Sequence, residues 1–119
     1  MRSSVNALVI SHRSVAATGD AYVAAIPKIR AAGWNGAIMV DAPGCGQNAN
    51  AILSHGAAIL AADPQKNVLF SWHIYGFVYD SQGGIPKQWN EQVDLVPTMQ
   101  ALKASGLAVI VGEFGPGRN

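Results

Sequence analysis

"GLAVIVGEFG", Gly106–Gly115, is an apolar run that ends on a carboxylate and a glycine. Three other runs share its character: "VNALVIS" at Val5–Ser11, "GAIMVDAP" at Gly36–Pro43 and "NVLFSWHIYG" at Asn67–Gly76. Near-continuous apolar runs of this length are typical of strands in a parallel sheet that is covered on both faces. The sequence therefore predicts four parallel strands.

Helical patterns lie between these runs, so strand and helix alternate along the chain. The first, "DAYVAAIPKIRAAG", places one apolar stripe at Tyr22, Ile26 and Ile29. Gly33 is expected to end this helix, and Pro27 predicts a kink or a restart inside it. "NAILSHGAAILAADP" predicts a helix that ends before Pro64, and "WNEQVDLVPTMQALKASG" predicts one that begins or bends at Pro97 and ends at Gly106. This alternation favours an α/β fold with right-handed crossovers.

Composition limits the class of protein. The 119 residues are 50% hydrophobic and 13% charged, with a net charge of +1, which predicts a single globular domain over residues 1–119. The sequence has no block of like charges that would indicate a nucleic-acid or anionic membrane partner. No run approaches the ~18 apolar residues of a membrane span. The three histidines lack the spacing of metal ligands, and the glycine-rich stretches lack a P-loop lysine, so we expect no cofactor.

Reactive side chains gather where the predicted strands end. In parallel α/β folds the carboxyl ends of the strands carry the functional groups. Those ends supply Ser11, His12, Arg13, Asp41, His73, Tyr75 and Glu113. Each has an ordinary structural alternative: Glu113 as a solvated charge, His73 as a core histidine, and Asp41 as a loop cap.

Two neighbours of these groups have structural interpretations of their own. Trp72 alternates with His73 along the strand, so it is expected to pack against the helices. Cys45, the single cysteine, excludes an internal disulfide and is a weak candidate for a catalytic thiol.

Taken together, "IPKIRAAGWNGAIMVDAPGCGQN", "ILAADPQKNVLFSWHIYG" and "GLAVIVGEFG" resemble glycoside hydrolase family 5, the cellulase and β-mannanase group. The resemblance covers about Ala21–Gly115, with the fragments in family order. It implies a partial (β/α)8 TIM barrel containing strands five to seven, with "VNALVIS" in the place of strand four. It also implies hydrolysis of a β-1,4-linked polysaccharide, cellulose or mannan, in a family whose members are often secreted.

The resemblance implies roles for individual residues. Glu113 matches the nucleophile of a retaining mechanism, and His73 and Tyr75 match residues that contact the sugar and orient that nucleophile. Further candidates for substrate contact are Asp41, Gln47, Trp72 and Trp89.

One part of the family pattern is missing. The family's acid/base glutamate, in an Asn-Glu pair at the end of strand four, has no counterpart at Ser11-His12. Retaining hydrolysis uses two carboxyl groups about 5–5.5 Å apart. The second glutamate, Glu91, falls in a predicted helix, which leaves His12 and Asp41 as alternative acids.

Four strands alone would leave two unpaired sheet edges. We therefore expect a homodimer that closes an eight-stranded barrel, in which the two Glu113 side chains face each other. Two other interpretations stay open: a carbohydrate-binding remnant without the acid, and a truncated product without an independent role.

Overall fold

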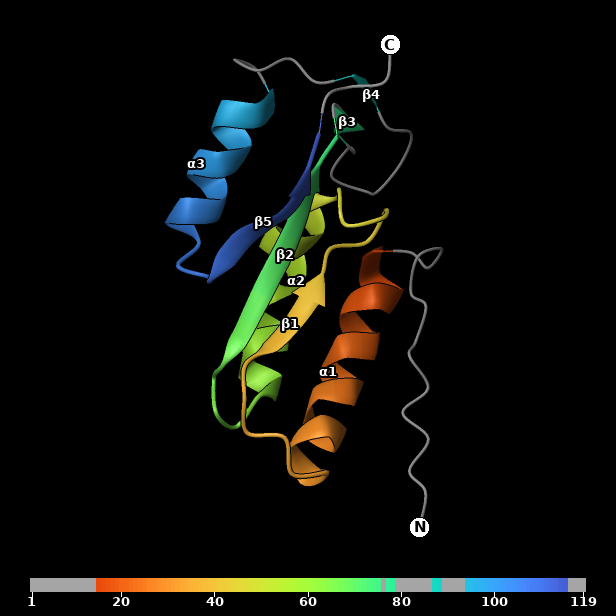
Figure 1. Cartoon of the computed structure of the whole chain (residues 1–119), viewed down its shortest axis with the longest axis vertical. Helices are drawn as coiled ribbons and strands as arrows, with labels where there is room; N and C mark the ends of the chain where they lie inside the picture. Colours follow the sequence, from red (N-terminus) through yellow and green to blue (C-terminus); the bar gives the residue numbers. More distant parts are fainter. Residues whose placement is uncertain (1–14, 76, 79–86, 89–93, 116–119) are drawn as a thin grey trace.

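The computed structural model describes residues 15–75, 77–78, 87–88 and 94–115 (Figure 1). The predicted strand Val5–Ser11 lies outside the described residues, as do His12, Trp89 and Glu91. The other three predicted strands are confirmed, and they form one parallel sheet in the order β1-β2-β5. Their bounds are Ile38–Asp41 for β1, Val68–Ile74 for β2 and Val109–Phe114 for β5. A short antiparallel pair, β3 (Phe77–Val78) with β4 (Lys87–Gln88), follows β2.

The three predicted helices are also confirmed. They are α1 (Val15–Ala31), α2 (Ala49–Ala62) and α3 (Val96–Ala104). Pro97 lies in the first turn of α3, where its missing N–H has no helical partner to lose. Gly106 follows the α3 cap with φ 73°, a left-handed conformation that glycine adopts readily.

Of the kink or restart predicted at Pro27, the restart was wrong, because α1 is a single helix with Pro27 inside it. Pro27 cannot donate to the carbonyl of Val23, one turn earlier. Both residues are exposed, so that carbonyl can turn toward water while the buried Ile26 keeps the helix on the core.

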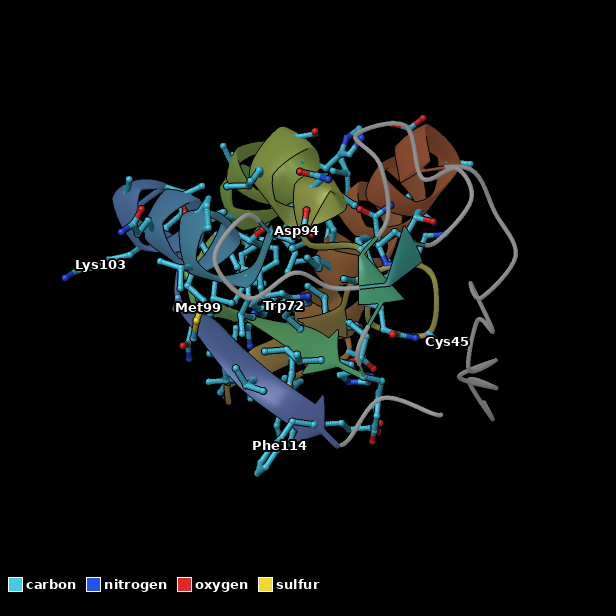
Figure 2. All side chains as sticks on the ribbon, turned by 90° about the horizontal axis from the view of Figure 1, so that it is seen from above. Cys45, Trp72, Asp94, Met99, Lys103 and Phe114 are labelled. Carbon is cyan, nitrogen blue, oxygen red and sulfur yellow. The ribbon has the colours of Figure 1, made fainter. Side chains whose placement is uncertain are left out.

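All three helices lie on one side of the parallel sheet, as Figure 2 shows in the view from above. The strands are neighbours in sequence order, and a helix connects each to the next. This single direction of winding is the arrangement of a barrel segment, since an open doubly wound sheet carries helices on both faces. No described helix has the length and apolar character needed to cross a membrane.

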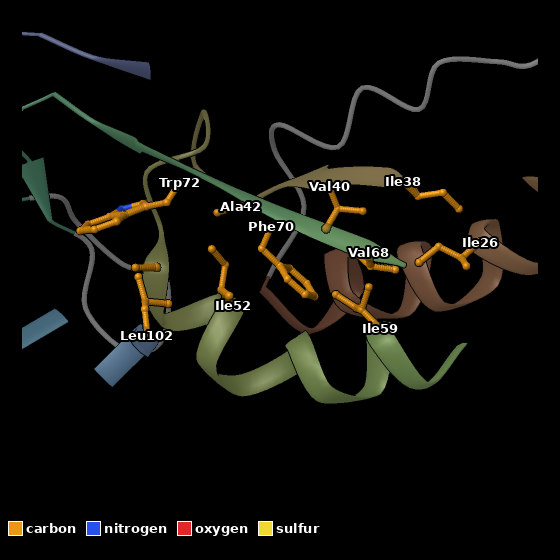
Figure 3. Close-up of a cluster of buried hydrophobic side chains, with 11 residues drawn as sticks. Ile26, Ile38, Val40, Ala42, Ile52, Ile59, Val68, Phe70, Trp72 and Leu102 are labelled. Carbon is orange, nitrogen blue, oxygen red and sulfur yellow. The ribbon is translucent and has the colours of Figure 1, made fainter. Parts of the chain in front are cut away.

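The core fills the space between the sheet and the helices (Figure 3). Alternate residues of β1 and β2 face it, and Phe70 and Trp72 are each only 1% exposed. The helices contribute Ile26 from α1, Ile52 and Ile59 from α2, and Leu102 from α3. The expectation that Trp72 packs against the helices is confirmed.

The face of the sheet opposite the helices is open in the described structure. Met39 of β1 is 58% exposed and Ile110 of β5 is 38% exposed. The prediction of a sheet covered on both faces therefore fails for these strands. Apolar side chains on both faces of a strand are also what a barrel needs, where one face packs on helices and the other on the barrel interior.

A buried ion pair holds the end of the sheet where β2 begins. The guanidinium of Arg30 donates two hydrogen bonds to Asp63, at 2.8 and 2.7 Å. Asp63 is fully buried and also accepts from the backbone N–H groups of Gln65 and Asn67. The Arg30 hydrogen bonds hold the pKa of the Asp63 carboxyl well below its usual range, against the opposing effect of burial. This pair fixes the turn from α2 into β2.

Candidate functional site

The carboxyl ends of the three strands bring four predicted site residues together. Asp41 ends β1, His73 lies near the end of β2, Tyr75 follows it, and Glu113 lies near the end of β5. His73 contacts both carboxylates: its Nε2 lies 3.4 Å from Asp41 Oδ1 and its Nδ1 lies 3.5 Å from Glu113 Oε2. Asp41 and Glu113, which are 72 residues apart in the sequence, thus contact the same imidazole ring.

A β-bulge determines the face on which Glu113 lies. Trp72 pairs with Val111, but the next residue of β2, His73, pairs with Glu113, so Gly112 is an extra residue in β5. Side chains alternate between the two faces of a strand, and paired residues of neighbouring strands share a face. Without the extra residue, Glu113 would pair with Ile74 and project from the other face. The bulge therefore brings the carboxylate beside His73.

Glu113 accepts a hydrogen bond from Tyr75. The phenol donates to Glu113 Oε2 at 3.0 Å. This hydrogen bond raises the pKa of Tyr75, because a phenolate would lose the bond and repel the carboxylate. Tyr75 therefore remains a donor at neutral pH. Glu113 is still 54% exposed, so a ligand can approach it.

His73 is the central residue of the site, and its side chain is only 12% exposed. Its Nδ1 lies 2.9 Å from the carbonyl oxygen of Cys45, and its backbone N–H donates to the carbonyl of Gly46 at 2.8 Å. Two elements therefore fix His73: the strand that carries it and the loop after β1.

That loop depends on a run of left-handed backbone. Gly44, Cys45 and Gly46 have φ values of 66°, 54° and 81°. A Cβ on Gly46 would overlap the His73 ring, so only glycine lets the backbone approach the imidazole this closely. The thiol of Cys45 is exposed, and it is the carbonyl of this residue that contacts the site.

The remaining candidates for substrate contact lie in different surroundings. Trp72 is in the core, where its indole N–H donates to the carbonyl of Gln47 at 3.2 Å, so its side chain is not presented to a ligand. Gln47 Oε1 is buried, with no hydrogen-bond partner among the described residues. At the end of the loop after β1, Asn48 caps α2, because its side chain accepts from the N–H of Ala51.

Sequence reasoning missed several residues that shape this site. Tyr22 donates to the carbonyl of Asp41 at 3.0 Å, and burial and the nearby Asp41 raise the pKa of its phenol. Ser71 contacts His73, and a Cβ on Gly112 of the neighbouring strand would overlap the Ser71 hydroxyl. The spacing of Ser71 and His73, two residues apart on one strand, was the available signal. Within the described part of the chain, no cluster of side chains could hold a metal ion.

The comparisons with known proteins agree with one another. Residues 10–119 match the family model described as Cellulase (glycosyl hydrolase family 5). The chain is 41% identical over 101 residues to a mannan endo-1,4-beta-mannosidase of Streptomyces lividans, which covers 84% of this chain and 24% of that protein. It is 37% identical over 99 residues to the enzyme of the same name from Salipaludibacillus agaradhaerens, covering 83% of this chain and 29% of that protein.

A solved structure extends the likeness to the fold. The mannohexaose complex of Thermomonospora fusca beta-mannanase matches with a TM-score of 0.69 and 34% identity, over 85% of this chain and 31% of that one. The predicted partial TIM barrel is thereby confirmed, with three described parallel strands. The chain spans less than a third of the length of each of these relatives.

Proposed function

The chain belongs to glycosyl hydrolase family 5, and from this premise we propose that it carries the nucleophile of a retaining β-1,4-mannan hydrolase. Glu113 is the nucleophile, and His73 and Tyr75 orient it. We propose mannan as the substrate, and not cellulose, because the relatives reported above are named mannan endo-1,4-beta-mannosidase or beta-mannanase.

The observation that carries the proposal is the way Glu113 is held. Tyr75 and His73 both approach Oε2, at 3.0 and 3.5 Å, from the strand beside Glu113. Among the described residues these contacts converge on one oxygen, which leaves Oε1 to attack. Contacts that hold one oxygen of a carboxylate fix the direction in which the other can attack, as a positioned nucleophile requires.

The chemistry then follows the two-step retaining path. Glu113 attacks the anomeric carbon, the bond to the leaving sugar breaks, and a covalent glycosyl-enzyme forms. A proton donor protonates the leaving oxygen, and water hydrolyses the intermediate in the second step. In the described structure the second carboxylate is Asp41, on the far side of the His73 ring. We include Asp41 in the proposal as the candidate acid, with Gln47 on the same loop contacting substrate.

An activated substrate tests the nucleophile separately from the acid. Dinitrophenolate leaves without protonation, so the first step on an aryl β-mannoside that carries it needs only the attacking carboxylate. We expect the 119-residue chain to release dinitrophenolate, and Glu113→Gln to lower the rate by about 10²-fold or more. Tyr75→Phe should lower it less, because His73 still contacts Oε2.

Asp20→Asn is the matched control, since it makes the same carboxylate-to-amide change at an exposed position of α1. Equal rates in Glu113→Gln and Asp20→Asn would contradict the proposal. If the wild-type chain releases no dinitrophenolate, but mannohexaose shifts the NMR signals of Tyr75 and His73, the chain is a carbohydrate-binding module and not a hydrolase.

A further inference from the structure

Ser71 is a buried polar residue on an otherwise apolar stretch of β2. It is 1% exposed and lies between Phe70 and Trp72, which are equally buried. A hydroxyl in such a position requires a hydrogen-bond partner. Its Oγ lies 3.3 Å from Nε2 of His73, two residues further along the same face of the strand.

The contacts of His73 determine which ring nitrogen carries the proton. Nδ1 lies 2.9 Å from the carbonyl oxygen of Cys45. A carbonyl only accepts, so Nδ1 must be the donor, and in the neutral ring Nε2 then holds a lone pair. The other groups that face the ring are the carboxylates of Asp41 and Glu113, which accept when they are ionised. When Asp41 is ionised, Ser71 is therefore, among the described residues, the group able to donate to Nε2.

The bulge in β5 provides the room for this contact. A Cβ on Gly112 would overlap Ser71 Oγ and would lie 3.3 Å from His73 Nε2. An alanine at this position would push the hydroxyl away from the ring. The extra residue that places Glu113 beside His73 is thus also the glycine that accommodates Ser71.

We propose that Ser71 is a positioning residue: its hydroxyl donates to His73 Nε2 and holds the imidazole as the Nδ1–H tautomer, with Nδ1 directed at the Cys45 carbonyl and Glu113. Through the imidazole, Ser71 fixes the position of Glu113 Oε2. The catalytic consequence rests on the proposed function, whereas the hydrogen bond and the tautomer do not.

Nitrogen-15 NMR of the histidine side chains in the 119-residue chain tests the assignment. At about pH 9, above the ordinary titration range of histidine, a protonated and an unprotonated ring nitrogen give well separated resonances. We expect Nδ1 of His73 to be the protonated nitrogen in the wild type. In Ser71→Ala, the serine hydroxyl no longer donates to Nε2, and the acceptor Asp41 still faces that nitrogen. The Nε2–H tautomer therefore gains population, and the two nitrogen resonances move toward each other.

A second variant tests the same bond without removing the hydroxyl. Gly112→Ala displaces Ser71 Oγ, and we expect it to change the His73 resonances in the direction seen for Ser71→Ala. Ser54→Ala is the matched control, because it removes an exposed serine hydroxyl that donates to the Asn50 carbonyl on α2. An Nε2–H tautomer in the wild type would overturn the proposal. So would a folded Ser71→Ala or Gly112→Ala whose His73 resonances match those of Ser54→Ala.

Kinetics with the dinitrophenyl mannoside provide the catalytic readout. We expect Ser71→Ala to lower kcat about tenfold with little change in KM, because it misplaces the attacking group and leaves the substrate contacts intact. An unchanged kcat in an active chain would overturn the positioning role. A chain without turnover contradicts the hydrolase proposal alone, since the NMR result decides the hydrogen bond independently.

Discussion

Replacing Gly46 with alanine tests whether the close approach of the loop to His73 holds the site together. Gly46 has φ 81°, and a Cβ there would overlap Nδ1, Cγ and Cε1 of the imidazole. The variant therefore loses stability for two reasons. Alanine is strained in a left-handed conformation, and its Cβ displaces an imidazole that is only 12% exposed. The matched control is Gly106→Ala, which has φ 73° and no atom within 4 Å of the added Cβ.

The expected difference between the two variants follows from these contacts. A left-handed alanine costs about 1–2 kcal/mol at either position, and the loss of glycine freedom in the unfolded chain largely cancels between them. Displacing the imidazole of His73 also breaks its bonds to the Cys45 carbonyl and to Ser71, each contributing about 1 kcal/mol. Gly46→Ala should therefore lose about 1–3 kcal/mol more than Gly106→Ala.

Urea unfolding at neutral pH measures this difference, and the His73 nitrogen resonances report the position of the ring. We expect Gly106→Ala to leave those resonances unchanged and Gly46→Ala to shift them. Equal losses of stability in the two variants, together with unchanged His73 resonances in Gly46→Ala, would refute the reasoning.

Two further predictions concern the ion pair and the open sheet face. The lowered pKa of Asp63 makes its ionised form stabilise the fold above the ordinary carboxyl range, and this contribution is lost as pH falls below it. The wild type should thus lose more unfolding free energy than Asp63→Asn between about pH 5 and pH 3, and equal pH slopes in urea titrations would argue against this account. Exposed Met39 and Ile110 favour the predicted homodimer, so light scattering across a dilution series should show a dimer that Met39→Lys weakens and Leu53→Lys, on α2, does not. A wild-type monomer at every concentration would exclude that dimer.

The elements of the described fold could be predicted from the sequence because each depends on local signals. Apolar runs gave the strands, and Pro97 and Gly106 marked the two ends of α3. The restart predicted at Pro27 was wrong because the free-energy cost of a proline inside a helix depends on whether the freed carbonyl is exposed to water. A sequence pattern does not report that exposure. The Arg30–Asp63 pair was not predicted, since its partners are 33 residues apart and meet only after α2 has packed.

The site could be predicted only in part. Alternation along β2 and the position of strand ends pointed to His73, Tyr75 and Glu113. The contacts between them depend on backbone details without a periodic signature: the left-handed loop through Gly46 and the bulge at Gly112. Glycine was visible at both positions, but its role depends on which neighbouring strand or side chain approaches it.

The place of the bulge explains how one sheet satisfies both packing and chemistry. Before it, the ladder runs without interruption from Phe70–Val109 to Trp72–Val111, and this register places Val109 beside Phe70 at the core. After it, the register changes by one residue, and His73 pairs with Glu113. A one-residue shift at Phe70 would turn Val109 away from the core, and a shift placed after His73 would leave Glu113 on the face opposite His73. The register shift between Trp72 and His73 therefore keeps Val109 at the core and still brings the Glu113 carboxylate to the imidazole.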